Sequence, residues 1–169
     1  MDAHPLDHVE LPLEIVDMLL LIAEDALEQV AADIVLHARI LRHWGVTKLG
    51  KHEYEESIDE MRHADWLIER ILFLGGLPNV QRMNQVLVGQ TVQEILECDL
   101  KLEDKALADL RDGIAHCETV RDYVTRDLFM HILDNEEEHV DFLERQFDMI
   151  ERMGIQNYIQ IQSKAAGEE

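Results

Sequence analysis

Apolar residues recur at intervals of three and four along most of this chain, with charged residues between them. The first run of this kind comprises Leu13, Val16, Leu20, Ala23, Leu27, Val30 and Ile34. Such spacing gathers apolar side chains on one face of an α-helix. It predicts a helix from about residue 13 to Arg42, which ends near Gly45.

The middle of the chain contains a second helical run and then a long segment without a clear period. The second helix is predicted from about His52 to Leu74, where Gly75 and Gly76 stop it. Residues 77–90 follow, beginning Leu-Pro-Asn and ending Val-Gly-Gln. This connection is long for one between helices, and its length suits a crossover that runs along a bundle.

The remaining sequence predicts three more helices. Thr91 begins a Thr-x-x-Glu capping box, which starts a third helix that reaches about Glu118. A fourth helix is predicted from about Val120 to Met153, and a short amphipathic one at Ile155–Gln162. The whole pattern predicts an all-α fold, namely a four-helix bundle with a long crossover and a short C-terminal fifth helix.

The composition fits one domain with a strongly acidic surface. A chain of 169 residues is long enough for a single complete core, so we expect one domain over residues 1–169, with its helical part at about 13–163. The net charge is −21, from 15 basic and 36 acidic residues. This charge opposes binding to nucleic acid or to an anionic membrane, and it favours cations as partners.

The cysteines and the N-terminus indicate a cytoplasmic protein. Cys98 and Cys117 form no CxxC pair and no disulfide framework, which favours a reducing compartment. The N-terminal Met-Asp-Ala-His-Pro lacks the basic region of a signal peptide. The apolar run at 18–23 is too short to span a bilayer.

Two Glu-x-x-His units carry the main chemical signal. Glu60 precedes His63 by three positions, and Glu136 precedes His139 in the same way. On a helix this spacing leaves the carboxylate and the imidazole roughly 60° apart, about one turn from each other. Each unit therefore presents an oxygen and a nitrogen ligand to one metal ion. Two such helices, with a lone Glu from each of two others, form the di-iron site of ferritin-like bundles.

Glu103, on the predicted third helix, is the candidate for one lone Glu. A set of carboxylates with two imidazoles suits iron or manganese better than the thiolate-rich sites of structural zinc. The alternative, a solvated charged face, applies more readily to one unit than to two. We expect Glu137 and Glu138 to be surface residues or to surround the ligands without binding the metal. Glu55 and Asp59 are expected on a solvated face, or on a path that guides iron inward.

Several stretches resemble bacterioferritins: Tyr54–Asp65, Glu69–Asn79, Leu36–Arg39, Trp44-Gly45 and Met153–Tyr158. The resemblance extends over about residues 13–163. It implies a ferritin-like bundle assembled into a hollow cage of twenty-four subunits. It also implies a ferric mineral inside the cage and a b-type haem held between two subunits.

The resemblance further implies a role for each candidate residue. Glu60 and Glu136 would bridge two irons, and His63 would be a terminal ligand to one of them. Glu103 and His139 would be terminal ligands to the other iron. These five residues would together catalyse Fe(II) oxidation.

Met61 matches the position of the family's axial haem ligand, one methionine coming from each of two subunits across a two-fold axis. Simple core packing is the alternative role of Met61. A haem at this position would make the chain an electron-transfer partner as well as a storage subunit.

Two positions depart from the family's pattern. Leu27 stands where the family has a terminal Glu ligand, and Ile34 replaces a Tyr beside the metal centre. Glu28 and Glu24 are the candidate substitute ligands. A local irregularity in the helix would turn Glu28 inward, whereas Glu24 lies nearer the same face but is displaced along the axis. We therefore expect an incomplete centre in which the iron at His63 lacks a ligand.

The leading hypothesis is an iron-storage subunit with ferroxidase activity that oxidises Fe(II) with O₂ or peroxide. One alternative is a haem-bearing, electron-transfer subunit of a mixed cage, paired with a second bacterioferritin subunit and with a redox partner for iron release. Another is a di-iron redox enzyme of the rubrerythrin type, which the lack of a CxxC pair disfavours. A metal-free structural bundle would bury five ionisable side chains at high cost.

Overall fold

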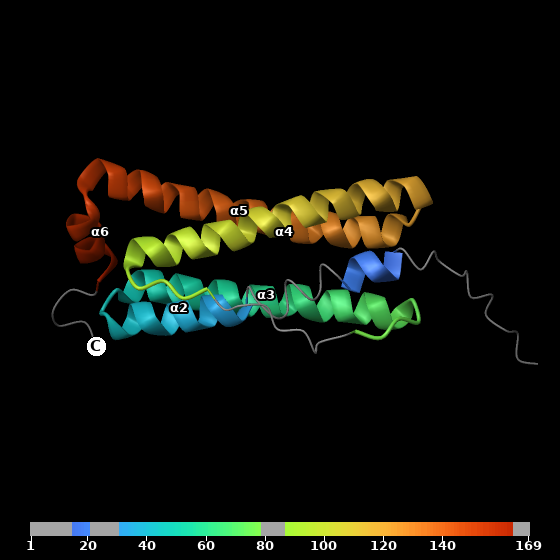
Figure 1. Ribbon diagram of the computed structural model, residues 1–169, viewed down its shortest axis with the longest axis horizontal. Helices are drawn as coiled ribbons and strands as arrows, with labels where there is room; N and C mark the ends of the chain where they lie inside the picture. Colours follow the sequence, from blue (N-terminus) through green and yellow to red (C-terminus); the bar gives the residue numbers. More distant parts are fainter. Residues whose placement is uncertain (1–14, 21–30, 79–86, 164–169) are drawn as a thin grey trace, which may run out of the picture.

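The computed structural model describes residues 15–20, 31–78 and 87–163. Residues 15–20 are helical. The labelled helices of Figure 1 are α2 (Ala31–His43), α3 (Thr47–Phe73), α4 (Val92–Val120), α5 (Tyr123–Met153) and α6 (Ile155–Gln162). The predicted all-α bundle with a short C-terminal helix is thereby confirmed for the described residues.

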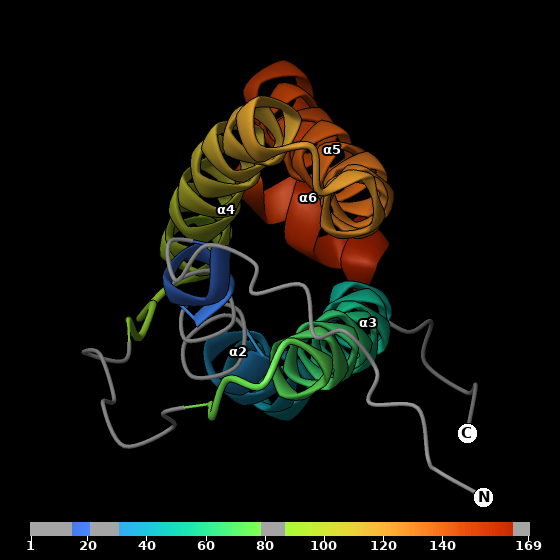
Figure 2. The same cartoon turned by 90° about the vertical axis from the view of Figure 1, so that its right-hand side faces the viewer.

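The long helices form two antiparallel pairs. Helix α2 packs along α3, and α4 packs along α5. The end-on view in Figure 2 shows these four helices around a common axis, with α6 lying across one end. Helix α3 ends at the opposite end of the bundle from the start of α4 (Figure 1). The long crossover expected between these helices includes residues 79–86, which lie outside the described residues.

Two predicted boundaries differ from the structure. Helix α3 begins at Thr47 rather than near His52, because Val46 and Leu49 are each only 1% exposed and bring this turn into the core. Helix α5 begins at Tyr123 rather than at Val120, after Asp122 as its N-cap. The single helix expected from residue 13 to Arg42 includes residues 21–30, which lie outside the described part of the chain.

The capping signals of the sequence are realised in the structure. The Glu94 backbone N–H donates to Thr91 Oγ1 at 3.1 Å. The Glu94 carboxylate accepts a hydrogen bond from the Gln90 N–H at 2.9 Å, one residue before the position expected for a capping box. Gly154, with φ of +79°, separates α5 from α6, since a positive φ suits glycine.

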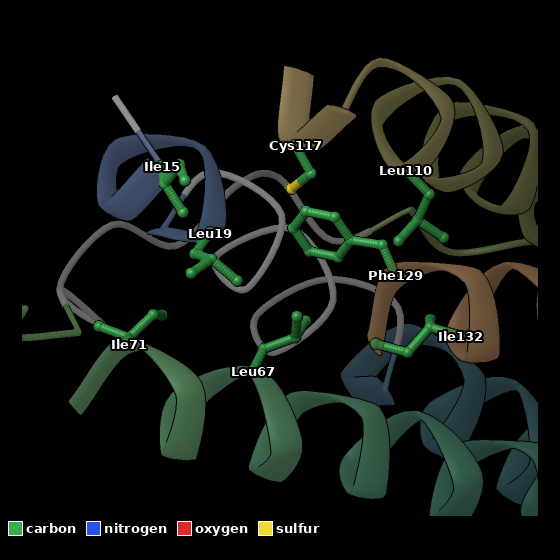
Figure 3. Close-up of a cluster of buried hydrophobic side chains, with 8 residues drawn as sticks. All are labelled: Ile15, Leu19, Leu67, Ile71, Leu110, Cys117, Phe129 and Ile132. Atoms are coloured by element: carbon green, nitrogen blue, oxygen red, sulfur yellow. The ribbon is translucent and has the colours of Figure 1, made fainter. Parts of the chain in front are cut away.

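Most of the apolar core of the described residues lies in two clusters at opposite ends of the bundle, and Ile34 and Leu102 form a third, smaller one. One cluster, shown in Figure 3, comprises Ile15, Leu19, Leu67, Ile71, Leu110, Cys117, Phe129 and Ile132. The other comprises Leu41, Val46, Leu49, Val92, Ile95, Leu96, Leu143 and Tyr158. Along α3, α4 and α5, the buried acidic and histidine residues lie between the members of these two clusters. The apolar ends thus enclose a polar middle section.

None of the helices within the described ranges is both long and apolar enough to cross a membrane.

Candidate metal centre

Three helices bring the predicted ligands together in the middle of the bundle. Glu60 comes from α3, Glu103 from α4, and Glu136 and His139 from α5. One ligand atom from each of these four side chains lies within 4.8 Å of the others. The three carboxylates are 1–2% exposed. A buried set of this kind has the size and the donor atoms of a site for a hard divalent cation.

His63 joins the same carboxylates from the side of α3. Its Nδ1 lies 2.9 Å from Glu136 Oε1 and 3.5 Å from Glu60 Oε1. Its Nε2 lies 3.3 Å from Asn135 Oδ1, which holds the ring in place. Unlike the other four residues, His63 is not part of the group gathered within 4.8 Å.

His139 contacts three carboxylates with one nitrogen. Its Nδ1 lies 3.5 Å from Glu60 Oε1, 3.5 Å from Glu136 Oε2 and 3.8 Å from Glu103 Oε1. Its Nε2 contacts the Glu56 carboxylate on the other side of the ring. Both imidazoles thus face Glu60 and Glu136, whereas only His139 also faces Glu103.

The polar atoms of this centre lack ordinary partners. Within the described residues, five buried ligand atoms have no hydrogen-bond partner: Glu60 Oε1, His63 Nδ1, Glu103 Oε2, Glu136 Oε2 and His139 Nδ1. Buried polar groups in proteins are almost always satisfied, so such a cluster needs an explanation. Cations bound among these side chains would satisfy these atoms. The donor set therefore fits metal ions on the chemistry of its own atoms.

The pKa values describe a cluster that holds protons when no metal is bound. Burial raises the pKa of Glu60 and of Glu103. Burial acts against the charged form of His63, but Glu136 and Glu60 outweigh it and raise its pKa to about 10. Burial also opposes ionisation of Glu136, yet the contacts with His139 and His63 bring its pKa below the usual value. Metal binding must displace these protons.

A cleft between α3 and α5 leads from the surface to this centre. Its volume is about 530 Å³. It is lined by His52, Glu56, Asp59, Asn135, Glu138, His139, Asp141, Phe142 and Arg145. Since His139 belongs to both the cleft and the ligand group, the cleft gives a cation access to the buried carboxylates.

A second buried network lies beside the centre. His37 donates from Nδ1 to Asp99 Oδ1 at 2.7 Å and accepts at Nε2 from the Gly89 N–H at 3.3 Å. Asp33 accepts from the Leu87 N–H at 3.0 Å. These bonds tie the end of the crossover to α2 and α4 next to the ligands.

Sequence reasoning missed four polar residues near the candidate ligands: the buried Glu53, Asp99 and Asp33, and the half-buried Glu56. The signal was available in part, because Glu53 and Glu56 precede Glu60 by seven and four positions and so share its face of the helix. Asp99 precedes Glu103 by four positions in the same way. A carboxylate on the face of a known ligand is the pattern to look for.

Other predicted positions fall as follows. Ile34 is buried and lines a small cavity together with Glu103 and His139, so it does lie beside the centre. Met61 is 58% exposed, which contradicts a core-packing role within one chain. Leu27, Glu28 and Glu24 lie outside the described residues, and the expected gap in the ligand set stays a prediction.

The acidic residues beside the ligands lie nearer to solvent. Glu137 and Glu138 are exposed, and Glu137 pairs with Arg111 at 2.9 Å. Glu55 is 59% exposed, and Asp59 pairs with Arg62.

Comparison with known proteins identifies the class first. The model of the ferritin-like domain matches residues 26–153 of this chain. A bacterioferritin from Brucella melitensis is 46% identical over 133 residues, which cover 79% of this chain and 83% of the relative. A bacterial ferritin from Synechocystis is 44% identical, covering 75% and 82%. A bacterioferritin from Mycobacterium avium is 41% identical, covering 73% and 77%.

These matches extend over most of the chain and over most of each relative. The chain therefore belongs to the bacterioferritin family of ferritin-like proteins.

Proposed function

We propose that this chain is an iron-storage subunit of a bacterioferritin-type cage in the cytoplasm, and that it oxidises Fe(II) at the carboxylate and imidazole centre. The observation that supports this most strongly is the buried group of Glu60, Glu103, Glu136 and His139, with ligand atoms within 4.8 Å of one another. Family membership supplies the storage role, and the acidic cleft beside His139 gives Fe(II) a way in.

In this proposal Fe(II) is the substrate, and the chain's residues hold two ions close together. Glu60 and Glu136 each face both histidines, which is the arrangement expected of two bridging carboxylates. Each Fe(II) loses one electron, and O₂ takes up these two electrons and two protons to leave as hydrogen peroxide. The Fe(III) ions then pass to the ferric mineral in the cage.

The two halves of the centre are proposed to differ in strength. The His139 half has Glu103 as a further carboxylate, whereas the His63 half has only the two shared ones among the described residues. With Leu27 in place of a ligand, the His63 half lacks a terminal anion. A carboxylate supplies charge and coordination to a hard cation, so its absence weakens binding and slows oxidation.

A b-type haem between two subunits is the second part of the proposal. Met61 lies on α3, and its side chain is largely exposed to solvent. A residue that binds a haem shared with a partner subunit must be exposed on the single chain in this way. A thioether is a soft, neutral ligand that favours electron transfer over oxygen chemistry. The haem would deliver electrons for iron release, in a cage of one chain type or in a mixed cage with a fully active subunit.

The test of the oxidation centre is a pair of matched substitutions. Glu136→Gln removes a shared carboxylate from the centre, whereas Glu137→Gln changes the exposed neighbour that pairs with Arg111. The initial rate of Fe(II) oxidation is measured from the absorbance of ferric species. We expect this rate to fall more than about tenfold in Glu136→Gln and to stay unchanged in Glu137→Gln. Equal rates in both variants and the unaltered protein would contradict the proposal.

A further inference from the structure

Two cavities meet at the same four side chains, which separate the open cleft from the buried centre. The cleft and a small inner cavity share His52, Glu56, His139 and Phe142 as lining residues. The inner cavity, about 10 Å³ in volume, also borders Glu103. A cation that moves between solvent and the centre through the cleft must therefore pass these side chains.

His52 and Glu56 place a nitrogen and an oxygen donor together at this boundary. They are four residues apart on α3, and His52 Nε2 lies 3.2 Å from Glu56 Oε1. This is a charge contact rather than a hydrogen bond, and within the described residues the buried His52 Nε2 makes no hydrogen bond. The imidazole packs against Phe142, with ring centroids 3.6 Å apart, so its orientation is fixed. Two ligands of one octahedral cation are about 3 Å apart at ligand distances of about 2.1 Å, which this spacing matches.

These donors stand apart from the centre already described. His139 presents Nδ1 to Glu60, Glu103 and Glu136, and presents Nε2 to Glu56. Glu56 thus lies on the cleft side of the imidazole ring, which separates it from the three buried ligand carboxylates.

The charge of the cleft favours a cation at this position. Four carboxylates line it, from Glu56, Asp59, Glu138 and Asp141, against one guanidinium, from Arg145. Arg145 is paired with Asp141, and Asp59 is paired with Arg62, which leaves Glu56 and Glu138 as the lining carboxylates without an arginine partner among the described residues. The excess of negative charge near His52 and Glu56 attracts divalent cations and draws them from solvent.

We propose that His52 and Glu56 form a second cation-binding site, for a divalent transition metal, on the cleft side of His139. Imidazole and carboxylate together suit Fe(II), Mn(II) and Zn(II). Two protein ligands leave several positions to water, so the site binds more weakly than the buried centre. Weak binding next to His139 makes it a loading site. Cation binding there needs no oxidation chemistry, and in this respect the inference goes beyond the proposed function.

The binding test uses Zn(II), which is redox-inert, on crystals of the assembled protein. We expect anomalous density between His52 Nε2 and the Glu56 carboxylate, in addition to density at the buried centre. His52→Ala should lose only the cleft density. The control variant His43→Ala, which removes an exposed histidine at the end of α2, should keep both.

The outcomes separate this inference from the proposed function. Density at the buried centre with an empty cleft overturns the loading site and leaves the proposed function standing. Density in the cleft with an empty buried centre supports the loading site and contradicts the proposed function. Cleft density that persists in His52→Ala also overturns the assignment, because the imidazole would then not be a ligand.

Kinetics provide a second readout of the loading role. In His52→Ala we expect the apparent KM for Fe(II) to rise about three- to tenfold, with kcat unchanged, since the loss affects capture and not oxidation. His43→Ala should leave both constants as they are. An unchanged KM in His52→Ala would overturn the loading role.

Discussion

His63 and His139 contact the same two carboxylates but have different surroundings. His139 meets Glu103 as well, while the second nitrogen of His63 meets the amide of Asn135. A neutral amide adds no charge for a cation at the His63 half. Among the described residues, the two halves therefore differ by one carboxylate, and the proposed cause, Leu27, can be tested by a single substitution.

Leu27→Glu should supply that ligand if this part of the chain is a regular helix. We expect Fe(II) oxidation to accelerate by about tenfold or more, because the His63 half then binds its ion as strongly as the His139 half. Stopped-flow oxidation with two Fe(II) per subunit measures this. Glu28→Ala is the companion variant, since a loss of oxidation there would show that Glu28 already replaces the missing ligand.

Metal binding should weaken as pH falls, because protons and metal ions compete for the same atoms. The pKa of His63 is raised to about 10 in the metal-free centre, so at neutral pH its Nδ1 lone pair is protonated or shared with Glu136. Each proton released makes the apparent affinity rise about tenfold per pH unit below that pKa. We expect Zn(II) titrations from pH 6 to pH 8 to show this slope, with proton release in an indicator assay. Affinity independent of pH would contradict it.

That Glu60 and His63, and Glu136 and His139, lie together could be predicted from the sequence, because each pair depends on spacing within one helix. Glu60 and His63 are one turn apart wherever their helix begins, so an error in the start of α3 did not affect them. Contacts across helices were not predictable in this way. The bond between His37 and Asp99 and the pairing of Glu56 with His139 depend on how the helices pack, which no local pattern records.

At the scale of elements, α3 carries most of the polar chemistry on one face. His52, Glu56, Glu60 and His63 follow one another at intervals of four, four and three residues. This stripe runs from the cleft to the buried centre, beside the face that packs into the apolar clusters. The start of α5 is held by the Asp122 cap and its pairing with Arg70, and the candidate ligands of α5 lie farther along the same helix.

Asp122→Ala should destabilise the start of α5. Asp122 accepts a hydrogen bond from the Thr125 N–H at 3.1 Å and pairs with Arg70 of α3 at 2.9 Å. Loss of an N-cap costs about 1–2 kcal/mol, so we expect a lower midpoint of thermal unfolding. Asp127→Ala is the control, because Asp127 is an exposed residue of the same helix. Among the described residues, its carboxylate pairs with the neighbouring Arg126.

The contribution of Asp122 should depend on pH in a defined direction. Burial acts against the charged carboxylate, but the Thr125 hydrogen bonds and Arg70 prevail and lower its pKa. A depressed pKa means that this stability is present above the usual Asp pKa and is lost as pH falls through the folded value. The difference between Asp122→Ala and the unaltered chain should therefore shrink below about pH 4. A constant difference would show that the charge does not contribute.

At the scale of the whole molecule, one chain leaves large apolar side chains uncovered. Phe73 is 77% exposed, and Leu77, Val124 and Met130 are also exposed. Patches of this kind on a single subunit indicate surfaces that other subunits cover. These exposed side chains and the family membership both indicate a multi-subunit cage.

Met61, which is also exposed on a single chain, is the proposed haem ligand. If haem binds between two subunits through this residue, Met61→Leu should remove the Soret band, because a leucine offers no sulfur to the iron. The substitution nearly conserves volume, so the assembly should persist. We expect light scattering to show roughly twentyfold the subunit mass or more for both proteins. Haem retained by Met61→Leu would rule out the ligand, and a stable monomer of the unaltered chain would rule out the cage itself.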